Sequence, residues 1–275
     1  LVDHFNKLAN KLKNSNFVLD IGSNDGILLA PLKKLGIKAI GVDPSINVGK
    51  IANKKGLKTI IDFFNVKVIK KISKEYSKPD TIVASSVITH LEKPIEFAKN
   101  IKKILKDNGV LIIEIEYLLN FIKNLEYERF YFDRPFYYSL RSIKVLFKSV
   151  GMSLIDVEKI NIHGGSLRCY IKNSKNIKQS SRCKKILKIE KKTLNKKAKI
   201  GFLSGDFRDH SVIFFLLDTF KYLRKKEIKL FAYSNNSNED DFTKLIKQYF
   251  DNWLLVVHKT DKDLINLIRK DNLDI

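Results

Sequence analysis

The stretch that most constrains the fold is residues 17–43, where a glycine turn at Gly22 joins an apolar run to a helical pattern over 27–35. A second apolar run ends at Asp43, 23 residues after Asp20. The pattern predicts a strand, a turn, a helix and a second strand. In α/β proteins ligands bind at such turns, and the carboxylate of Asp43 is placed to accept hydrogen bonds from both hydroxyls of a ribose.

The turn departs from a dinucleotide-binding fingerprint, whose second glycine lets the backbone approach a pyrophosphate. Here Ser23, Asn24 and Asp25 separate Gly22 from Gly26. The negative charge of Asp25, with a second carboxylate at the entrance to the loop, disfavours phosphate and favours a cationic nucleoside. S-adenosylmethionine is such a ligand. The alternative is an ordinary tight turn that binds nothing.

Several segments resemble the family of S-adenosylmethionine-dependent sugar C-methyltransferases. They are V-L-D-I-G-S-N-D-G-I-L-L from Val18, I-G-V-D-P-S from Ile40, T-I-I-D-F-F from Thr59, H-L-E-K-P from His90, L-K-D-N-G-V-L-I-I-E from Leu105 and H-G-G-S-L-R-C-Y from His163. Together they cover residues 17 to about 171. The resemblance implies a class I methyltransferase domain, with a Rossmann-like α/β sheet, over residues 1–172.

The resemblance also implies a set of cofactor-binding residues. These candidates are Asp20, Gly22, Ser23, Asn24, Gly26, Asp43, Pro44, Asp62, Phe63 and Ser85. Of these, Asp20 and the two glycines are expected to line the methionine end of S-adenosylmethionine. Asp43 is expected at the ribose, and Asp62 with Phe63 beside the adenine.

The catalytic residues are harder to assign, because the family's Y-H-E-H segment reads Tyr131, Phe132, Asp133 and Arg134 here. Phenylalanine accepts no proton and arginine stays charged, so the family's base is missing. The candidates for the role of base are His163, Asp133 and His90, and Tyr131 is a further catalytic candidate. Two interpretations follow: a methyltransferase acting on a sugar or glycan-related acceptor, or a degenerate domain that binds cofactor without turnover.

Strand and helix patterns alternate along residues 17–115, which predicts a mainly parallel sheet covered by helices. An aromatic and charged segment starting at Tyr127 is expected to cover the carboxyl ends of the strands, where the acceptor would bind. A helix over 139–150 and two strands, at 154–160 and 166–171, complete the predicted domain.

Residues 173–197 are predicted to be a basic linker with some helical character. From Lys172 to Lys199 there are twelve lysines and arginines and one acidic residue, Glu190. The whole chain has a formal net charge of +22, with 44 lysines and 8 arginines. This bias is typical of an AT-rich coding sequence, and no recognition motif accompanies it. A basic nucleic-acid-binding module is therefore the weaker alternative, and nucleic acid an unlikely partner.

Residues 198–275 are predicted to form a partial second Rossmann-like βαβ unit. Its opening K-I-G-F-L-S-G-D-F-R-D-H-S from Lys199, with later segments, resembles the start of the O-linked N-acetylglucosamine transferase (SPINDLY-type) catalytic region. The resemblance implies an incomplete GT-B-like N-terminal lobe with His210 near the acceptor. A UDP-sugar would bind only in a longer protein. An alternative function is a protein glycosyltransferase whose methyltransferase domain is accessory.

Cysteine content and hydropathy bear on metal sites, disulfides, membrane spans and cellular location. Only Cys169 and Cys183 are present, with no C-x-x-C pair, so neither a metal site nor a disulfide framework is expected. No apolar run approaches the roughly 18 residues of a membrane-spanning helix, and the first residues lack a signal-peptide pattern. A reducing, cytoplasmic location is expected. Both ends of the sequence are expected to be cut from a longer chain.

Overall fold

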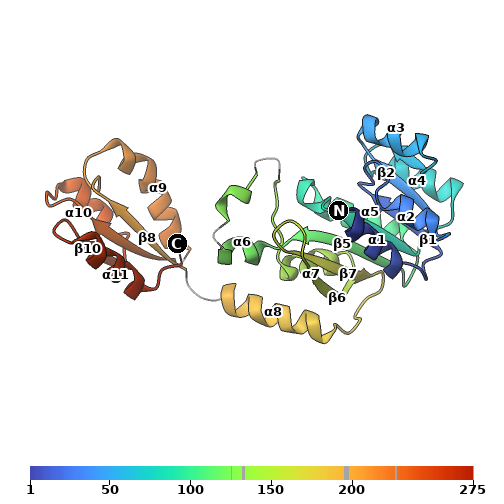
Figure 1. The fold of residues 1–275 in the computed structure, drawn as a ribbon. Coiled ribbons are helices and arrows are strands. Elements are labelled where there is room, and N and C mark those ends of the chain that lie inside the picture. Colours follow the sequence, from blue (N-terminus) through green and yellow to red (C-terminus); the bar gives the residue numbers. More distant parts are fainter. Residues whose placement is uncertain (125, 132–133, 195–197, 227, 275) are drawn as a thin grey trace. The chain divides into compact units, whose positions relative to one another are not determined.

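The structure is a computed structural model that describes residues 1–274 except 125, 132–133, 195–197 and 227. It consists of two compact units, Leu1–Lys191 and Lys192–Ile275 (Figure 1). Each unit has its own sheet and its own apolar core, as expected of separate domains.

Unit 1 alternates strands and helices through most of its length. Its strands are β1 (Phe17–Ile21), β2 (Lys38–Asp43), β3 (Thr59–Ile61), β4 (Thr81–Ser85), β5 (Val110–Glu116), β6 (Ser153–Ile160) and β7 (Ser166–Lys172). Its helices are α1 (Val2–Lys11), α2 (Leu29–Lys34), α3 (Ile46–Lys54), α4 (Val66–Glu75), α5 (Pro94–Ile104), α6 (Leu118–Asn124), α7 (Leu140–Ser149) and α8 (Ser181–Leu194), with short 3₁₀ turns η1 (Ile88–His90) and η2 (Tyr127–Arg129).

The seven strands form one sheet in the order β3-β2-β1-β4-β5-β7-β6. The strands β1 to β5 are parallel to one another, and β7 runs antiparallel between β5 and β6. The predicted mainly parallel sheet is confirmed. Because β1 to β4 are parallel, their carboxyl ends lie along one edge, which is where the candidate cofactor residues fall.

Each face of the sheet is covered by its own set of helices. On one face, Leu8 and Leu12 of α1 and Leu32 of α2 pack on Val18 and Val83. On the opposite face, α4, α5, α7 and α8 bury the larger core. Strand residues alternate between the two cores, so Asp20, Ser85 and Glu114 continue the side of Val18, Val83 and Ile112, on which α1 packs.

Helix α3 has a weak helix pattern in the sequence, and its composition explains why. It contains Gly49, which has low helix propensity and breaks the expected pattern. A Cβ at Gly49 would lie 2.7 Å from Cγ1 of Ile61, so the glycine permits the helix to pack closely on β3. Tertiary packing therefore outweighs local propensity here.

Helix α8 is the main departure from the predicted organisation, because most of the expected linker belongs to unit 1. Cys183 and Ile186 are buried in the larger core. Glu190, the one acidic residue of the basic stretch, is fully buried and accepts the backbone N–H groups of Leu140 (2.7 Å) and Arg141 (2.8 Å). The boundary between the units lies after Lys191, within the predicted linker segment 173–197.

Unit 2 has three parallel strands in the order β10-β9-β8. They are β8 (Lys199–Ser204), β9 (Lys229–Ser234) and β10 (Asn252–Leu255), connected and followed by α9 (Ser211–Lys225), α10 (Asp241–Lys247) and α11 (Asp261–Asp271). Aromatic residues fill its core, where Phe250 makes edge-to-face contacts with both Phe207 and Phe220. The backbone N–H of Asp274 donates to the carbonyl of Lys199 at 2.8 Å and ties the last residues to β8.

Within the part of the chain that the structure describes, no helix is both long and apolar enough to cross a bilayer.

The anchoring role of Glu190 gives a first prediction. Glu190→Ala removes the acceptor of two N–H groups at the start of α7, so we expect the free energy of unfolding of unit 1 to fall by about 1–3 kcal/mol. Lys191→Ala, at the neighbouring exposed residue, should change it by less than about 0.5 kcal/mol. Chemical denaturation of the full chain measures both, and equal effects would contradict the anchoring role.

Candidate active site

The carboxyl ends of four neighbouring strands bring the predicted cofactor residues to one edge of the sheet. Asp20 lies near the end of β1 and Asp43 ends β2, while Asp62 follows β3 and Ser85 ends β4. The backbone N–H of Asp62 donates to the carbonyl of Asp43 at 3.1 Å, so these two residues are in contact. This edge of the sheet therefore carries polar groups at the strand ends, as the sequence pattern predicted.

The turn after β1 adopts the backbone that its glycines permit. Gly22 has φ +74° and Gly26 has φ +87°, and between them Asn24 has φ +50°. Asparagine tolerates this left-handed conformation, so Asn24 takes a backbone shape that usually requires glycine. Its N–H donates to Oδ2 of Asp43 at 2.8 Å, which ties the turn directly to the end of β2.

Asp43 has the geometry of a ribose-binding carboxylate. Its side chain is 8% exposed, and Oδ1 accepts the N–H of Ser45 at 2.9 Å while Oδ2 accepts that of Asn24. Two oxygens have about four acceptor positions, so half of them remain for hydroxyl donors. The residues present therefore fit a nucleoside whose ribose lies over the turn.

Asp20 is a buried carboxyl group without a hydrogen-bond partner among the described residues. Burial raises its pKa well above the usual range, and the negative charges of Asp43 and Glu114 raise it further. A cation placed here would relieve both effects. The site therefore fits a positively charged group, as the sequence predicted.

Other candidates in the turn have packing roles in the structure. The hydroxyl of Ser23 is buried, and a Cβ at Gly41 would lie 2.2 Å from it. A Cβ at Gly26 would lie 2.5 Å from Cδ1 of Leu57, so this glycine allows close packing. The charge of Asp25 is paired with Lys55 at 2.9 Å on the surface, which leaves the deeper carboxylates to disfavour phosphate.

The adenine-side candidates are more open to solvent. Phe63 is 71% exposed, and its N–H donates to Oδ1 of Asp62 at 2.7 Å. Pro44 is also exposed, directly after β2. An exposed aromatic ring beside a strand end is available for stacking on a base.

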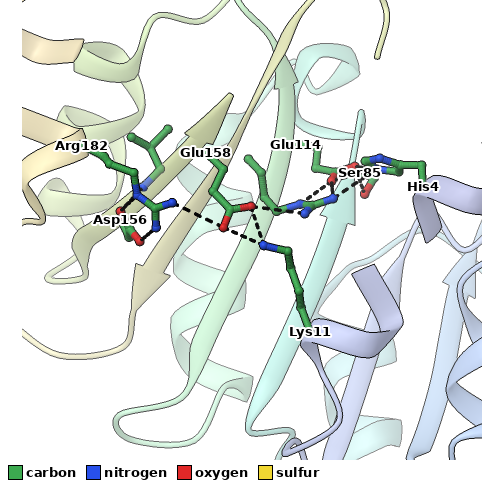
Figure 2. A network of polar contacts seen from close by, with 9 residues as sticks. His4, Lys11, Ser85, Glu114, Asp156, Glu158 and Arg182 are labelled. Carbon is green, nitrogen blue, oxygen red and sulfur yellow. Dashed lines mark hydrogen bonds and ion pairs between the residues drawn. The ribbon is translucent and has the colours of Figure 1, made fainter. Parts of the chain in front are cut away.

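A buried polar network lies at the ends of β4 and β5 (Figure 2). Glu114 is 1% exposed, accepts the hydroxyl of Ser85 at 2.9 Å and accepts Nε of Arg168 at 2.7 Å. From α1, His4 reaches the same carboxylate at 3.0 Å, and Lys11 binds Glu158 at 2.8 Å. The network joins the N-terminal helix to the sheet beside the cofactor edge.

A second buried carboxylate, Glu116, organises the aromatic segment expected to cover the acceptor. It binds Arg129 at 3.0 Å and Arg134 at 2.5 Å. The guanidinium of Arg134 also stacks over the ring of Tyr131, and Arg129 donates to the carbonyl of His163. Three residues that the sequence singled out are thus joined through one carboxylate.

The remaining catalytic candidates are placed differently. His90 is exposed at the end of η1, and Asp133, with Phe132, lies outside the described residues. His210 belongs to unit 2, where its Nδ1 accepts the N–H of Val212 at 3.3 Å and caps α9. Across the described residues, no group of three or more His, Cys, Asp or Glu side chains is placed to hold a metal ion.

A model of the methyltransferase domain family matches residues 1–157, more than half of the chain. The chain belongs to the methyltransferase domain family. Magnesium protoporphyrin IX methyltransferase from Synechocystis PCC 6803, solved with bound SAH, shares the fold of 63% of this chain and 83% of its own, at 15% identity and a TM-score of 0.50. With the strand order, this likeness confirms the class I Rossmann-like methyltransferase fold.

Two characterised relatives indicate the range of acceptors within the family. C-methyltransferase NovU of Streptomyces niveus is 27% identical over 173 residues, which cover 61% of this chain and 41% of the relative. Ubiquinone biosynthesis O-methyltransferase of Pelagibacter ubique (strain HTCC1062) is 36% identical over 106 residues, covering 37% and 42%. The chain spans less than half the length of either methyltransferase.

The methyltransferase domain contains site residues that sequence reasoning missed. Glu114 and Glu116 are two carboxylates on one face of the otherwise apolar strand β5, a pattern that alone marks an unusual strand. His4 and Arg168 carried no such signal, because their contact with Glu114 joins segments 110 and 54 residues apart.

The turn geometry gives a second prediction. Gly22→Ala forces a side chain onto a positive φ and brings its Cβ to 2.5 Å from Cγ2 of Val87, so the free energy of unfolding should fall by about 2–4 kcal/mol. Gly36 is a matched control, because it has φ +71° and nothing within 4 Å of a Cβ. Gly36→Ala should cost about 1 kcal/mol. If urea denaturation showed equal losses of unfolding free energy for the two variants, the Val87 side chain would have moved to accommodate the added methyl group.

Proposed function

We propose that unit 1 is an S-adenosylmethionine-dependent methyltransferase acting on a sugar or glycan-related small-molecule acceptor. The observation that carries the proposal is the edge formed by Asp20 and Asp43, where a buried carboxyl group without a cationic partner among the described residues lies next to a ribose-type carboxylate. Membership of the methyltransferase domain family supports it. The cofactor of such a domain is S-adenosylmethionine.

Each of three residues at this edge would bind a different part of the cofactor. Asp43 would hold the ribose hydroxyls, Asp20 the α-ammonium group, and Phe63 the face of the adenine. When bound, the cofactor supplies a methyl group on a sulfonium, a leaving group that needs little further activation. The protein's main contribution is then to hold the acceptor in line at about 3–3.5 Å from the methyl carbon.

The acceptor would enter beneath the segment that Glu116 organises. Arg134 stands where the family has a histidine, and its charge neutralises Glu116. The Arg134 side chain therefore anchors the aromatic segment over the acceptor and takes no proton. The relatives include both a C-methyltransferase and an O-methyltransferase, which supports methyl transfer to carbon or oxygen as the reaction type. A cofactor-binding domain without turnover is the alternative.

The proposal concerns unit 1 alone. In unit 2, His210 caps α9, which accounts for this histidine without a role in glycosyl transfer. Transfer from a UDP-sugar would need a second lobe in a longer protein, so we do not assign that activity to this chain.

The proposed function is tested with the full chain, labelled S-adenosylmethionine and a panel of nucleotide-linked keto-sugars and glycans, read by mass spectrometry. We expect a mass increase of one methyl group in at least one acceptor, at a rate that falls when Asp43 is replaced. Cofactor binding with no methylated product anywhere in the panel would favour the alternative without turnover.

Asp43 gives a third prediction. Asp43→Ala should weaken S-adenosylmethionine binding at least tenfold, because two hydrogen bonds to a charged acceptor are lost at about 1.5–3 kcal/mol each. Asp25→Ala is the matched control, since it removes a carboxylate from the same turn that is paired with Lys55. Calorimetry should show less than a twofold effect for the control. Unchanged affinity in Asp43→Ala, with its fold intact by circular dichroism, would remove Asp43 from the site.

The raised pKa of Asp20 gives a fourth prediction. In the free protein this carboxyl group holds its proton to a higher pH than usual, and an ammonium group beside it lowers the pKa again. Binding of S-adenosylmethionine at a pH where Asp20 still holds its proton should therefore release protons. The binding enthalpy should vary with the ionisation enthalpy of the buffer, and Asp20→Asn should remove that variation. A buffer-independent enthalpy in the unaltered chain would contradict the assignment.

A further inference from the structure

The pair formed by His4 and Glu114 has a geometry that the proposed function does not yet use. Nε2 of His4 lies 3.0 Å from both carboxylate oxygens of Glu114. Glu114 is 1% exposed and His4 13% exposed, so the pair is shielded while the imidazole retains access to solvent. Figure 2 shows His4 projecting from α1 toward Glu114 and Ser85.

The surroundings of Glu114 fix which imidazole nitrogen carries the proton. Arg168 donates through Nε to the same carboxylate at 2.7 Å, so Glu114 acts as a hydrogen-bond acceptor. Nε2 of His4 lies 3.0 Å from both oxygens of Glu114 and 3.4 Å from Nη2 of Arg168. In the tautomer that donates from Nε2 along the shorter contacts to Glu114, the neutral ring presents Nδ1 with a free lone pair. Nδ1 has no hydrogen-bond partner among the described residues. A carboxylate that orients a histidine in this way also stabilises the imidazolium.

The pair lies at the edge where the cofactor would bind. Glu114 pairs in register with Ser85 at the end of β4, and its charge raises the pKa of Asp20 on β1. The charged or titratable groups around His4 are Glu114 on β5, Arg168 on β7 and, through Arg168, Glu158 on β6. The imidazole is thus held at the carboxyl ends of β4 and β5, next to the methionine end of the proposed cofactor site.

Methyl transfer to a hydroxyl or to a carbon next to a ketone requires a base, and the segment that resembles the family's Y-H-E-H has Phe132 and Arg134 in place of its two histidines. A guanidinium bound to Glu116 takes no proton. Histidine is the side chain whose ordinary pKa suits proton removal near neutral pH. His4 is a histidine held by a buried carboxylate at this edge.

We propose that His4 is the general base of the methyl transfer, with Glu114 as its positioning residue; this inference rests on the proposed function. Nδ1 of His4 removes the proton from the acceptor O–H or from the carbon next to the ketone. The acceptor's electron pair forms the new bond to the methyl carbon, and the carbon–sulfur bond breaks to leave a neutral thioether. The proton on Nδ1 then passes to solvent.

A matched control on the same helix distinguishes catalysis by His4 from a purely structural role, in which His4 only joins α1 to the sheet. Lys11 lies two helical turns from His4 and joins α1 to the sheet through Glu158 at 2.8 Å. Lys11→Met removes this tie and leaves the imidazole in place. His4→Gln retains an N–H donor for Glu114 and removes the proton acceptor.

The experiment compares these variants as full chains, with labelled S-adenosylmethionine and the panel acceptor that the unaltered chain methylates fastest. We expect His4→Gln to lower kcat by 10²- to 10⁴-fold, while cofactor affinity stays within twofold. Lys11→Met should retain kcat within threefold. Protonation of Nδ1 would remove the base, so kcat of the unaltered chain should fall at acidic pH, and this fall should be absent in His4→Gln.

Two results would overturn the inference, and they are distinguishable from a failure of the proposed function. If His4→Gln retained kcat within threefold, or if Lys11→Met lost as much as His4→Gln, His4 would have only a structural role while methyl transfer stood. If the unaltered chain bound S-adenosylmethionine and methylated no acceptor, the proposed function would fail first, and the base with it.

Discussion

The structure of unit 1 depends on carboxylates buried at the carboxyl edge of its sheet. A buried carboxylate is stable only when hydrogen bonds or opposite charges compensate it. Glu114 has Arg168, and Glu116 has Arg129 and Arg134. The carboxyl group of Asp20 has no such cation among the described residues. The compensated carboxylates therefore anchor structure, and the uncompensated one marks where a cationic ligand is accepted.

The two anchored carboxylates draw distant segments to the same edge. Glu114 holds α1 through His4, and Glu116 holds the aromatic segment after α6. A third buried carboxylate, Glu190, fixes α8 against the start of α7. The walls around the proposed cofactor site are thus set by a few buried charges, with apolar packing supplying most of the stability around them. A change at any of these carboxylates should alter the shape of the site as well as its charge.

The parts of the fold that the sequence predicted are those encoded locally. The apolar runs, the glycine turn and the carboxylates at the strand ends lie within short windows, so their periodicity and spacing were sufficient. His4 could not be predicted, because its partner lies 110 residues away and a lone histidine in a helix has no pattern. Helix α8 read as a solvated linker because its lysines outnumber its apolar residues; one buried glutamate reverses that interpretation.

The central claim is that this edge binds the cofactor through its carboxylates. The most direct measurement is a crystal structure of the full chain with S-adenosylhomocysteine. The account predicts ribose hydroxyls within hydrogen-bond distance of Asp43, the ligand's amino group beside Asp20, and Nδ1 of His4 facing the acceptor side. A nucleoside bound elsewhere, with the carboxylate of Asp43 contacting only Asn24 and Ser45, would contradict it.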